Sequence, residues 1–150
     1  MLDETTMRGF TLVEFFLILI IILFILALLL PLGFNFYKGQ QLQICSQQIL
    51  QALRQAQSKA MGIEADSNFG VYFDNANQKY ILFKGSSYVP GDPDNEEFDL
   101  PSIITVTGAS GVVFSKLKGI PNFIGDITIR NNDSIKTINI NEIGRINLEP

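Results

Sequence analysis

The chain has 150 residues, a net charge of −4 and no histidine, and this length suffices for one membrane anchor and one small domain. The absence of histidine excludes Ser-His and Cys-His nucleophilic catalysis and histidine metal sites, and the single cysteine excludes an intrachain disulfide. Residues 63–150 carry twelve acidic and seven basic side chains, and an acidic domain of this kind is a poor binder of nucleic acid.

A long apolar run, Phe15 to Leu30, follows Glu14 near the start of the chain. As a helix, residues 10–30 would extend about 31 Å, which matches a hydrocarbon core of about 30 Å. The run is longer than a secretory signal and no Ala-x-Ala site follows it, so we predict a retained transmembrane helix in contact with lipid. A carboxylate at the head of such a span costs a few kcal/mol, so Glu14 is expected to have a charged partner. The alternative is an interfacial residue that snorkels to the membrane surface.

Pro31 stands where the apolar run ends, and its ring and missing N–H weaken one helical turn. Either the helix stops at the membrane surface, or it continues through a kink. We favour the kink, because a helical pattern resumes at once and makes residues 31–62 an amphipathic helix ending near Met61.

The stripe of this second half repeats every three or four residues. Its members are Leu42, Cys45, Ile49, Leu53, Ala56 and Ala60, widened by Ile44 and Leu50. Cys45 is interpreted as a small core residue, and a redox or intermolecular role is the alternative.

After Gly62 the apolar period changes to two, which is typical of strands. Expected strands are Phe69–Asp74, Lys79–Lys84, Ser102–Thr107, Val112–Ser115, Ile127–Arg130, Ile135–Ile140 and Arg145–Leu148. The predicted fold class is therefore α+β: a long N-terminal helix, half transmembrane and half amphipathic, packed on a small antiparallel β domain of residues 63–150. We expect a three- or four-stranded sheet on the helix and a second, small sheet.

The stretch Val89–Asp99 is predicted to be a loop from its proline, glycine and acidic residues. Asp92, Asp94 and Glu96 alternate in it, and such hard oxygen ligands are candidates for calcium. A solvated acidic loop is the simpler interpretation, because the rest of an EF-hand pattern is missing. No other metal and no cofactor is predicted.

The string Gly9-Phe10-Thr11-Leu12-Val13-Glu14, followed by about twenty apolar residues, resembles the class III signal of type IV pilins and type II secretion pseudopilins. The resemblance implies a leader of residues 1–9, cleavage between Gly9 and Phe10 by a membrane prepilin peptidase, and N-methylation of Phe10 by the same enzyme. It also implies a single-pass protein of the bacterial inner membrane, with a cytoplasmic N-terminus and an outer, pilin-like domain. Other pilin or pseudopilin subunits would be its partners, and Glu14 would pair with the amino terminus of a neighbour during filament assembly.

The rest of the chain is similar to the GspH/FimT type of minor pilin in three stretches: residues 53–60, residues 69–71 and residues 138–146. Two departures are visible. The leader is acidic where such leaders are usually basic, so translation could begin at Met7. Relatives active in DNA uptake end in Gly-Arg-x-Arg, whereas here Asn147 replaces the second arginine.

Three functional hypotheses follow from the sequence. The first is a minor pilin or pseudopilin, a structural subunit of a type IV pilus or type II secretion filament. The second is a competence pilin that contacts DNA, against which the charge count speaks. The third is a membrane-tethered enzyme or sensor that never assembles, for which the sequence contains no catalytic constellation.

Overall fold

The computed structural model describes residues 11–62 and 66–149, with side chains for all of these except residues 29–38. Contacts divide the chain into two units, residues 1–37 and residues 38–150. A single helix, α1 (Leu12–Met61), passes through Pro31 and ends at Met61. The kink at Pro31 stays a prediction.

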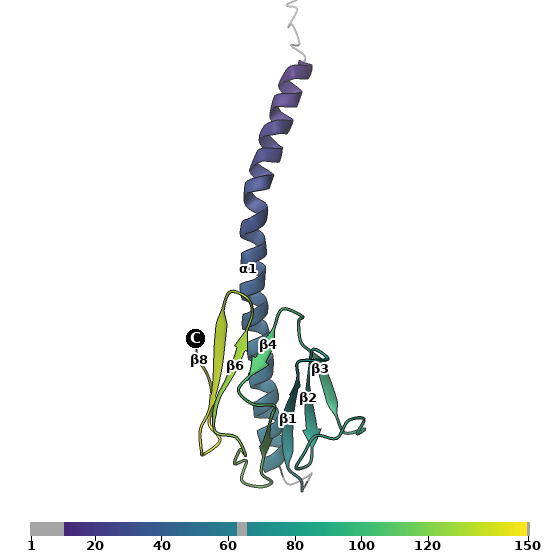
Figure 1. The fold of residues 1–150 in the computed structure, drawn as a ribbon, viewed down its shortest axis with the longest axis vertical. Coiled ribbons are helices and arrows are strands. Elements are labelled where there is room, and N and C mark those ends of the chain that lie inside the picture. The colour runs from purple at the N-terminus through teal and green to yellow at the C-terminus, as the bar shows by residue number, and fades with distance from the viewer. Residues whose placement is uncertain (1–10, 63–65, 150) are drawn as a thin grey trace, which may run out of the picture. The chain divides into compact units, whose positions relative to one another are not determined.

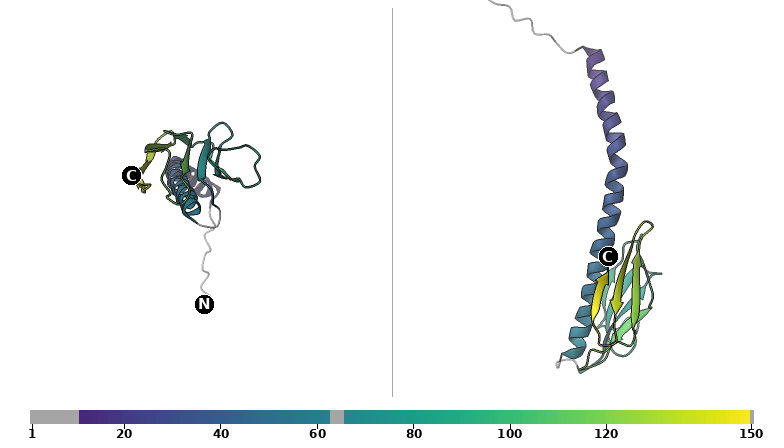
Figure 2. Two further views of the ribbon diagram at one scale, coloured as in Figure 1. Left: turned by 90° about the horizontal axis from the view of Figure 1, so that it is seen from below. Right: turned by 90° about the vertical axis from the view of Figure 1, so that its left-hand side faces the viewer.

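Eight strands follow the helix and form two antiparallel four-stranded sheets. The first sheet has the order β3-β2-β1-β5, with β1 (Phe69–Asp74), β2 (Lys79–Lys84), β3 (Glu96–Asp99) and β5 (Gly111–Phe114). The second has the order β4-β6-β7-β8, with β4 (Thr105–Thr107), β6 (Gly125–Arg130), β7 (Ile135–Ile140) and β8 (Ile146–Glu149). In Figures 1 and 2, the two sheets flank the C-terminal half of α1. The α+β prediction is confirmed, and the second sheet is as large as the first.

The core lies between the two sheets and the predicted helix stripe. All six stripe residues and Leu50 are buried, and they form one cluster with apolar side chains from both sheets. Ile44 contradicts the prediction, because it is 56% exposed on the opposite face of the helix. The sequence misplaced it because each helical residue turns about 100° from the one before, so Ile44, two residues after Leu42, faces away from the stripe.

The first sheet also buries side chains on its outer face. Ile81 and Phe83 are buried there, and Tyr88, from the segment after β2, stacks on Tyr72 with ring centroids 4.5 Å apart. Gly70 leaves the space for this layer, because a Cβ atom there would lie 2.6 Å from the Phe83 ring. The region after β2 is thus folded onto the sheet and covers part of it.

Strand β3 corrects the prediction that all of Val89–Asp99 is a loop. It pairs with β2, with Phe98 opposite Tyr80 and the two rings stacked at 5.0 Å. All four β3 residues are exposed, so the strand carries no alternation of buried and exposed residues that the sequence could have revealed. The hairpin β1–β2 and the strand β7 match their predicted bounds. The other four strands differ: β4 starts three residues later than predicted, β6 starts two residues earlier, β5 is shifted back by one residue and β8 forward by one.

Cys45 lies in the core, and burial raises the pKa of its thiol to about 11. Because only the thiolate is nucleophilic, we expect the folded protein at pH 8 to react with a thiol reagent at least about a hundredfold more slowly than the urea-unfolded protein. Stopped-flow labelling in both states measures this ratio. Equal rates would contradict the core assignment and favour a reactive role.

Candidate functional site

The first turn of α1 is fixed by Thr11. Its hydroxyl oxygen Oγ1 accepts a hydrogen bond from the Glu14 backbone N–H at 3.3 Å, and its carbonyl accepts one from the Phe15 N–H at 3.1 Å. Thr11 is therefore the N-cap and Glu14 the third helical residue, the positions of a Thr-x-x-Glu capping box. A carboxylate in the first turn is also favoured by the helix dipole. The predicted site residue Glu14 is exposed at this end of the helix.

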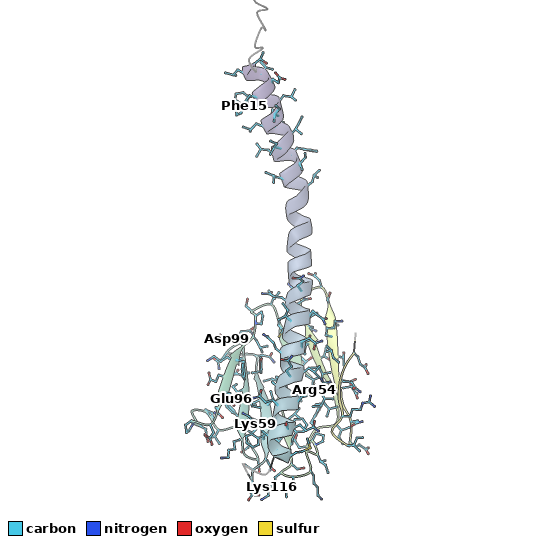
Figure 3. All side chains as sticks on the ribbon, turned by 180° about the vertical axis from the view of Figure 1, so that it is seen from behind. Phe15, Arg54, Lys59, Glu96, Asp99 and Lys116 are labelled. Atoms are coloured by element: carbon cyan, nitrogen blue, oxygen red, sulfur yellow. The ribbon has the colours of Figure 1, made fainter. Side chains whose placement is uncertain are left out.

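The helix surface that follows Glu14 is apolar on every side. Large apolar side chains from Leu12 to Leu28 are between 40% and 74% exposed, and Figure 3 shows them projecting outward around the helix at and beyond Phe15. Within the part of the chain whose side chains are described, no helical stretch is both long and apolar enough to cross a membrane. Because exposed apolar side chains lie all around the helix, residues 12–28 have no amphipathic stripe.

Three other predicted site residues are Gly9, Phe10 and Pro31. Gly9 and Phe10, on either side of the expected cleavage point, lie outside the described residues. Pro31 lies within α1, but its side chain is also outside the description.

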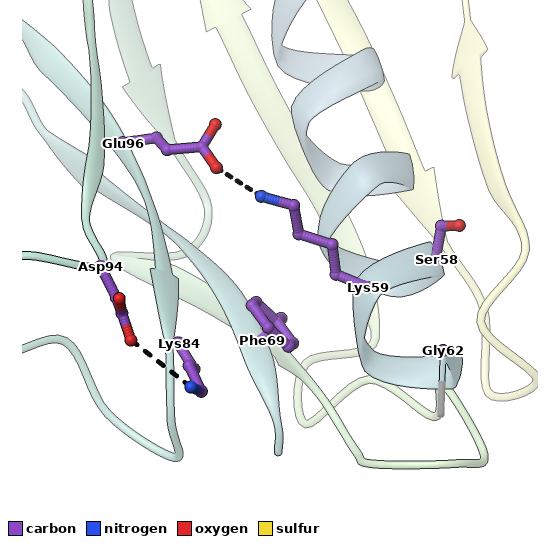
Figure 4. A pocket seen from close by; sticks show the side chains of 7 residues that line it. All are labelled: Ser58, Lys59, Gly62, Phe69, Lys84, Asp94 and Glu96. Atoms are coloured by element: carbon purple, nitrogen blue, oxygen red, sulfur yellow. Dashed lines mark hydrogen bonds and ion pairs between the residues drawn. The ribbon is translucent and has the colours of Figure 1, made fainter. Parts of the chain in front are cut away.

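An open groove of about 530 Å³ lies in residues 38–150, beside the C-terminal end of α1. Figure 4 shows the Phe69 ring in this groove between two ion pairs, Lys59 with Glu96 and Lys84 with Asp94, the second at 3.4 Å. Each ammonium group already has a carboxylate partner, and exposed pairs of this kind contribute at most about 1 kcal/mol. The groove thus presents balanced charges rather than a cationic or anionic site.

The two ion pairs of the groove involve Asp94 and Glu96, which are two of the three calcium candidates. Asp94 and Glu96 pair with different lysines, and Asp92 Oδ1 accepts a hydrogen bond from the Asp94 backbone N–H at 2.9 Å. The described residues contain no group of three or more acidic or cysteine side chains that could hold a metal ion. The structure therefore gives calcium binding by Asp92, Asp94 and Glu96 no support.

Two amide side chains hold the domain together in ways that the sequence did not reveal. Asn75, in the β1–β2 turn, donates to the Val106 carbonyl at 2.7 Å and accepts from the Val106 N–H at 3.0 Å, so it links the two sheets. Gln57 Nε2, on the helix, donates to the carbonyls of Gly119 and Gly144 at 3.1 and 2.7 Å. Their partners lie 31, 62 and 87 residues away, so no local pattern could indicate these bonds. Thr11 was also not predicted as a cap, but here a local signal exists, because the Thr-x-x-Glu spacing of residues 11–14 is typical of a helix start.

Comparison with solved structures identifies the fold as that of a pilin subunit: a long N-terminal helix packed on antiparallel sheets. A crystal structure of the type IV minor pilin FimU of Pseudomonas aeruginosa superimposes with a TM-score of 0.59 and 17% sequence identity, over 77% of this chain and 92% of FimU. A second crystal form of FimU gives a TM-score of 0.54, also at 17% identity, over 72% of this chain and 92% of FimU. No protein-family model and no curated protein matches the sequence. The solved structures that it resembles are pilin subunits, not enzymes.

Proposed function

We propose that this protein is a minor pilin or pseudopilin, a structural subunit of a type IV pilus or type II secretion filament. The observation that carries the proposal is the combination of a pilin-like fold with a capped helix start at Thr11, immediately after the Gly9-Phe10 junction. A structural similarity at 17% sequence identity supports the architecture alone. The functional part of the proposal rests on the sequence around Gly9 and Phe10, which resembles a prepilin peptidase signal.

In this proposal the apolar half of the helix first anchors the subunit in the inner membrane and then packs against the helices of other subunits. The exposed leucine, isoleucine and phenylalanine side chains suit both the lipid bilayer and a bundle of helices. Each of these two environments offers apolar contacts all around the helix. Prepilin peptidase cleaves the leader on the cytoplasmic side and methylates Phe10, while residues 38–150 fold outside the membrane.

Glu14 supplies the specificity of assembly in this scheme. As an intramembrane charge it is costly alone, and pairing with the new amino terminus of a neighbouring subunit satisfies both charges in a low dielectric. The pair would form only at one axial offset of the two helices, so it selects the register of neighbours. The cap at Thr11 keeps the carboxylate in the first turn, close to the processed end of its own chain.

Processing is the first test of the proposal. Gly9→Leu is expected to leave the leader attached when the protein is expressed with a prepilin peptidase, because the bulky side chain replaces the small residue before the scissile bond. Intact mass spectrometry would show the full chain instead of a product beginning with methylated Phe10. Leu2→Ala is the matched control within the leader and should be cleaved normally.

Normal cleavage of Gly9→Leu would contradict the assigned site. A wild-type protein that keeps Met1 or Met7 in the presence of the peptidase would contradict the proposed function itself.

A further inference from the structure

The two sheets end in four edge strands, and three of these bond to other parts of the domain. At β5, the N–H and the carbonyl of Val113 bond to Asn122, at 2.8 and 2.9 Å. At β4, the Asn75 amide bonds both backbone groups of the middle residue. At β8, the Arg54 guanidinium donates to the Ile146 carbonyl at 3.2 Å. Such contacts reduce the number of unpaired backbone groups that an edge offers to another chain.

Strand β3 is the fourth edge, and its outward backbone groups are open. It is the last strand of the first sheet in Figure 1. The Leu100 N–H donates to the carbonyl of Gln78, directly opposite, at 2.7 Å. Because hydrogen-bonded pairs alternate along an antiparallel ladder, Phe98 bonds to β2, while the backbone groups of Glu97 and Asp99 point away from it. In residues 11–62 and 66–149, no other segment bonds to these outward groups.

The side chains along this open edge alternate between acidic and aromatic. Glu97 and Asp99 lie on the outer face of the sheet, where Lys79 Nζ pairs with Glu97 Oε2 at 2.7 Å and also lies opposite Asp99 in the register. One lysine thus faces two carboxylates. Phe98 lies on the other face, stacked on Tyr80, and it remains 36% exposed.

This pattern disfavours pairing with a second copy of β3. In an antiparallel pair of two such strands, carboxylates on one face would lie opposite carboxylates, which is destabilising. A strand with lysine or arginine at alternate positions has the opposite effect, because its cations would lie opposite Glu97 and Asp99. An apolar residue between those cations would lie beside Phe98.

We propose that the open edge of β3 is a docking site for an extended segment of another protein, in which basic residues alternate with apolar ones. The segment adds to the first sheet as a fifth strand. Its main chain bonds to the outward groups of Glu97 and Asp99, and its side chains provide the specificity. The inference goes beyond the proposed function and does not depend on it, because it concerns residues of the β domain alone.

A pair of substitutions at one position tests the backbone contact. Glu97→Pro removes the outward N–H, and proline is tolerated there because that N–H does not bond to β2. Glu97→Gln is the matched control, since it also removes the carboxylate but keeps the N–H. Unchanged hydrogen-exchange protection of the Phe98 amide would verify that β3 still pairs with β2 in both variants.

The probe is a fluorescently labelled hexapeptide of alternating lysine and valine, added to full chains in neutral detergent micelles and followed by fluorescence anisotropy. The wild type is expected to bind it at least about tenfold more tightly than a hexapeptide of alternating glutamate and valine. Glu97→Pro should bind the lysine peptide at least about fivefold more weakly than Glu97→Gln, because one main-chain hydrogen bond is lost. In the wild type, the bound peptide should slow hydrogen exchange of the Glu97 and Asp99 amides.

Three results would overturn the inference: no binding of the lysine peptide by the wild type, equal binding of the two peptides, or equal binding by the two variants. If sedimentation equilibrium shows self-association of the wild type that Glu97→Pro abolishes, the occupant is a second copy and a basic partner is refuted. None of these measurements involves cleavage at Gly9, so failure of this inference and failure of the proposed function are distinguishable.

Discussion

Glu14→Ala is expected to reduce incorporation of the processed subunit into filaments by at least about tenfold, which corresponds to about 1.4 kcal/mol. Removing one member of a desolvated ion pair leaves the other charge unpaired, and this typically costs about 3 to 5 kcal/mol, so tenfold is a lower bound. The substitution keeps the cap of the helix, because the Thr11 hydroxyl oxygen accepts its hydrogen bond from the backbone N–H of residue 14 and not from the Glu14 side chain. Alanine is in addition the best helix former.

The measurement is co-purification of the variant with sheared or detergent-extracted filaments, with intact mass as a check that the leader has been removed. Glu142→Ala is the matched control, since Glu142 is an exposed carboxylate in the segment between β7 and β8. Wild-type incorporation of Glu14→Ala would refute the charge-pair mechanism. Loss of cleavage as well as assembly would assign Glu14 to the peptidase step instead.

Gly108→Ala is expected to destabilise the β domain by about 2 to 5 kcal/mol, the sum of a left-handed backbone cost and a steric clash. Gly108 has φ +107°, and a Cβ atom there would lie 2.2 Å from the Asp126 carbonyl oxygen. Because the clash is with backbone at the start of β6, no side-chain rotation can relieve it. The residue stands where the chain leaves β4 for β5 and thereby crosses from one sheet to the other.

Gly91→Ala separates the two contributions. Gly91 also has a positive φ, +79°, but nothing lies within 4 Å of a Cβ atom there, so only the backbone cost of about 1 to 2 kcal/mol applies. Urea unfolding of the full chain in detergent gives the free energy of unfolding of both variants. Tyrosine fluorescence monitors the unfolding, because the chain has no tryptophan. Equal destabilisation by the two substitutions would show that β6 moves aside and that the crossing is not sterically fixed.

The segment between β4 and β5 also shows where sequence reasoning reached its limit. Two expected strands separated by a glycine-rich link are compatible with a hairpin, yet β4 pairs with β6 and β5 pairs with β1. Strand pairing depends on which edges remain open once the rest of the sheet has formed, and that is not a local property of the link. Strand β3 was missed for a related reason: its exposed acidic residues are held by pairing with β2, not by their own preference.

The sequence by itself determined those features whose physical cause is local. The apolar run, the helix stripe that meets the core, the end of the helix at Met61, the β1–β2 hairpin and the motif around Glu14 all depend on residues within a few turns of one another. Only the tertiary structure decided the division of eight strands into two equal sheets and the amide links made by Asn75 and Gln57. Each of these depends on contacts between segments that are distant in the chain. Bringing such segments together costs conformational entropy, and the packed core as a whole offsets this cost.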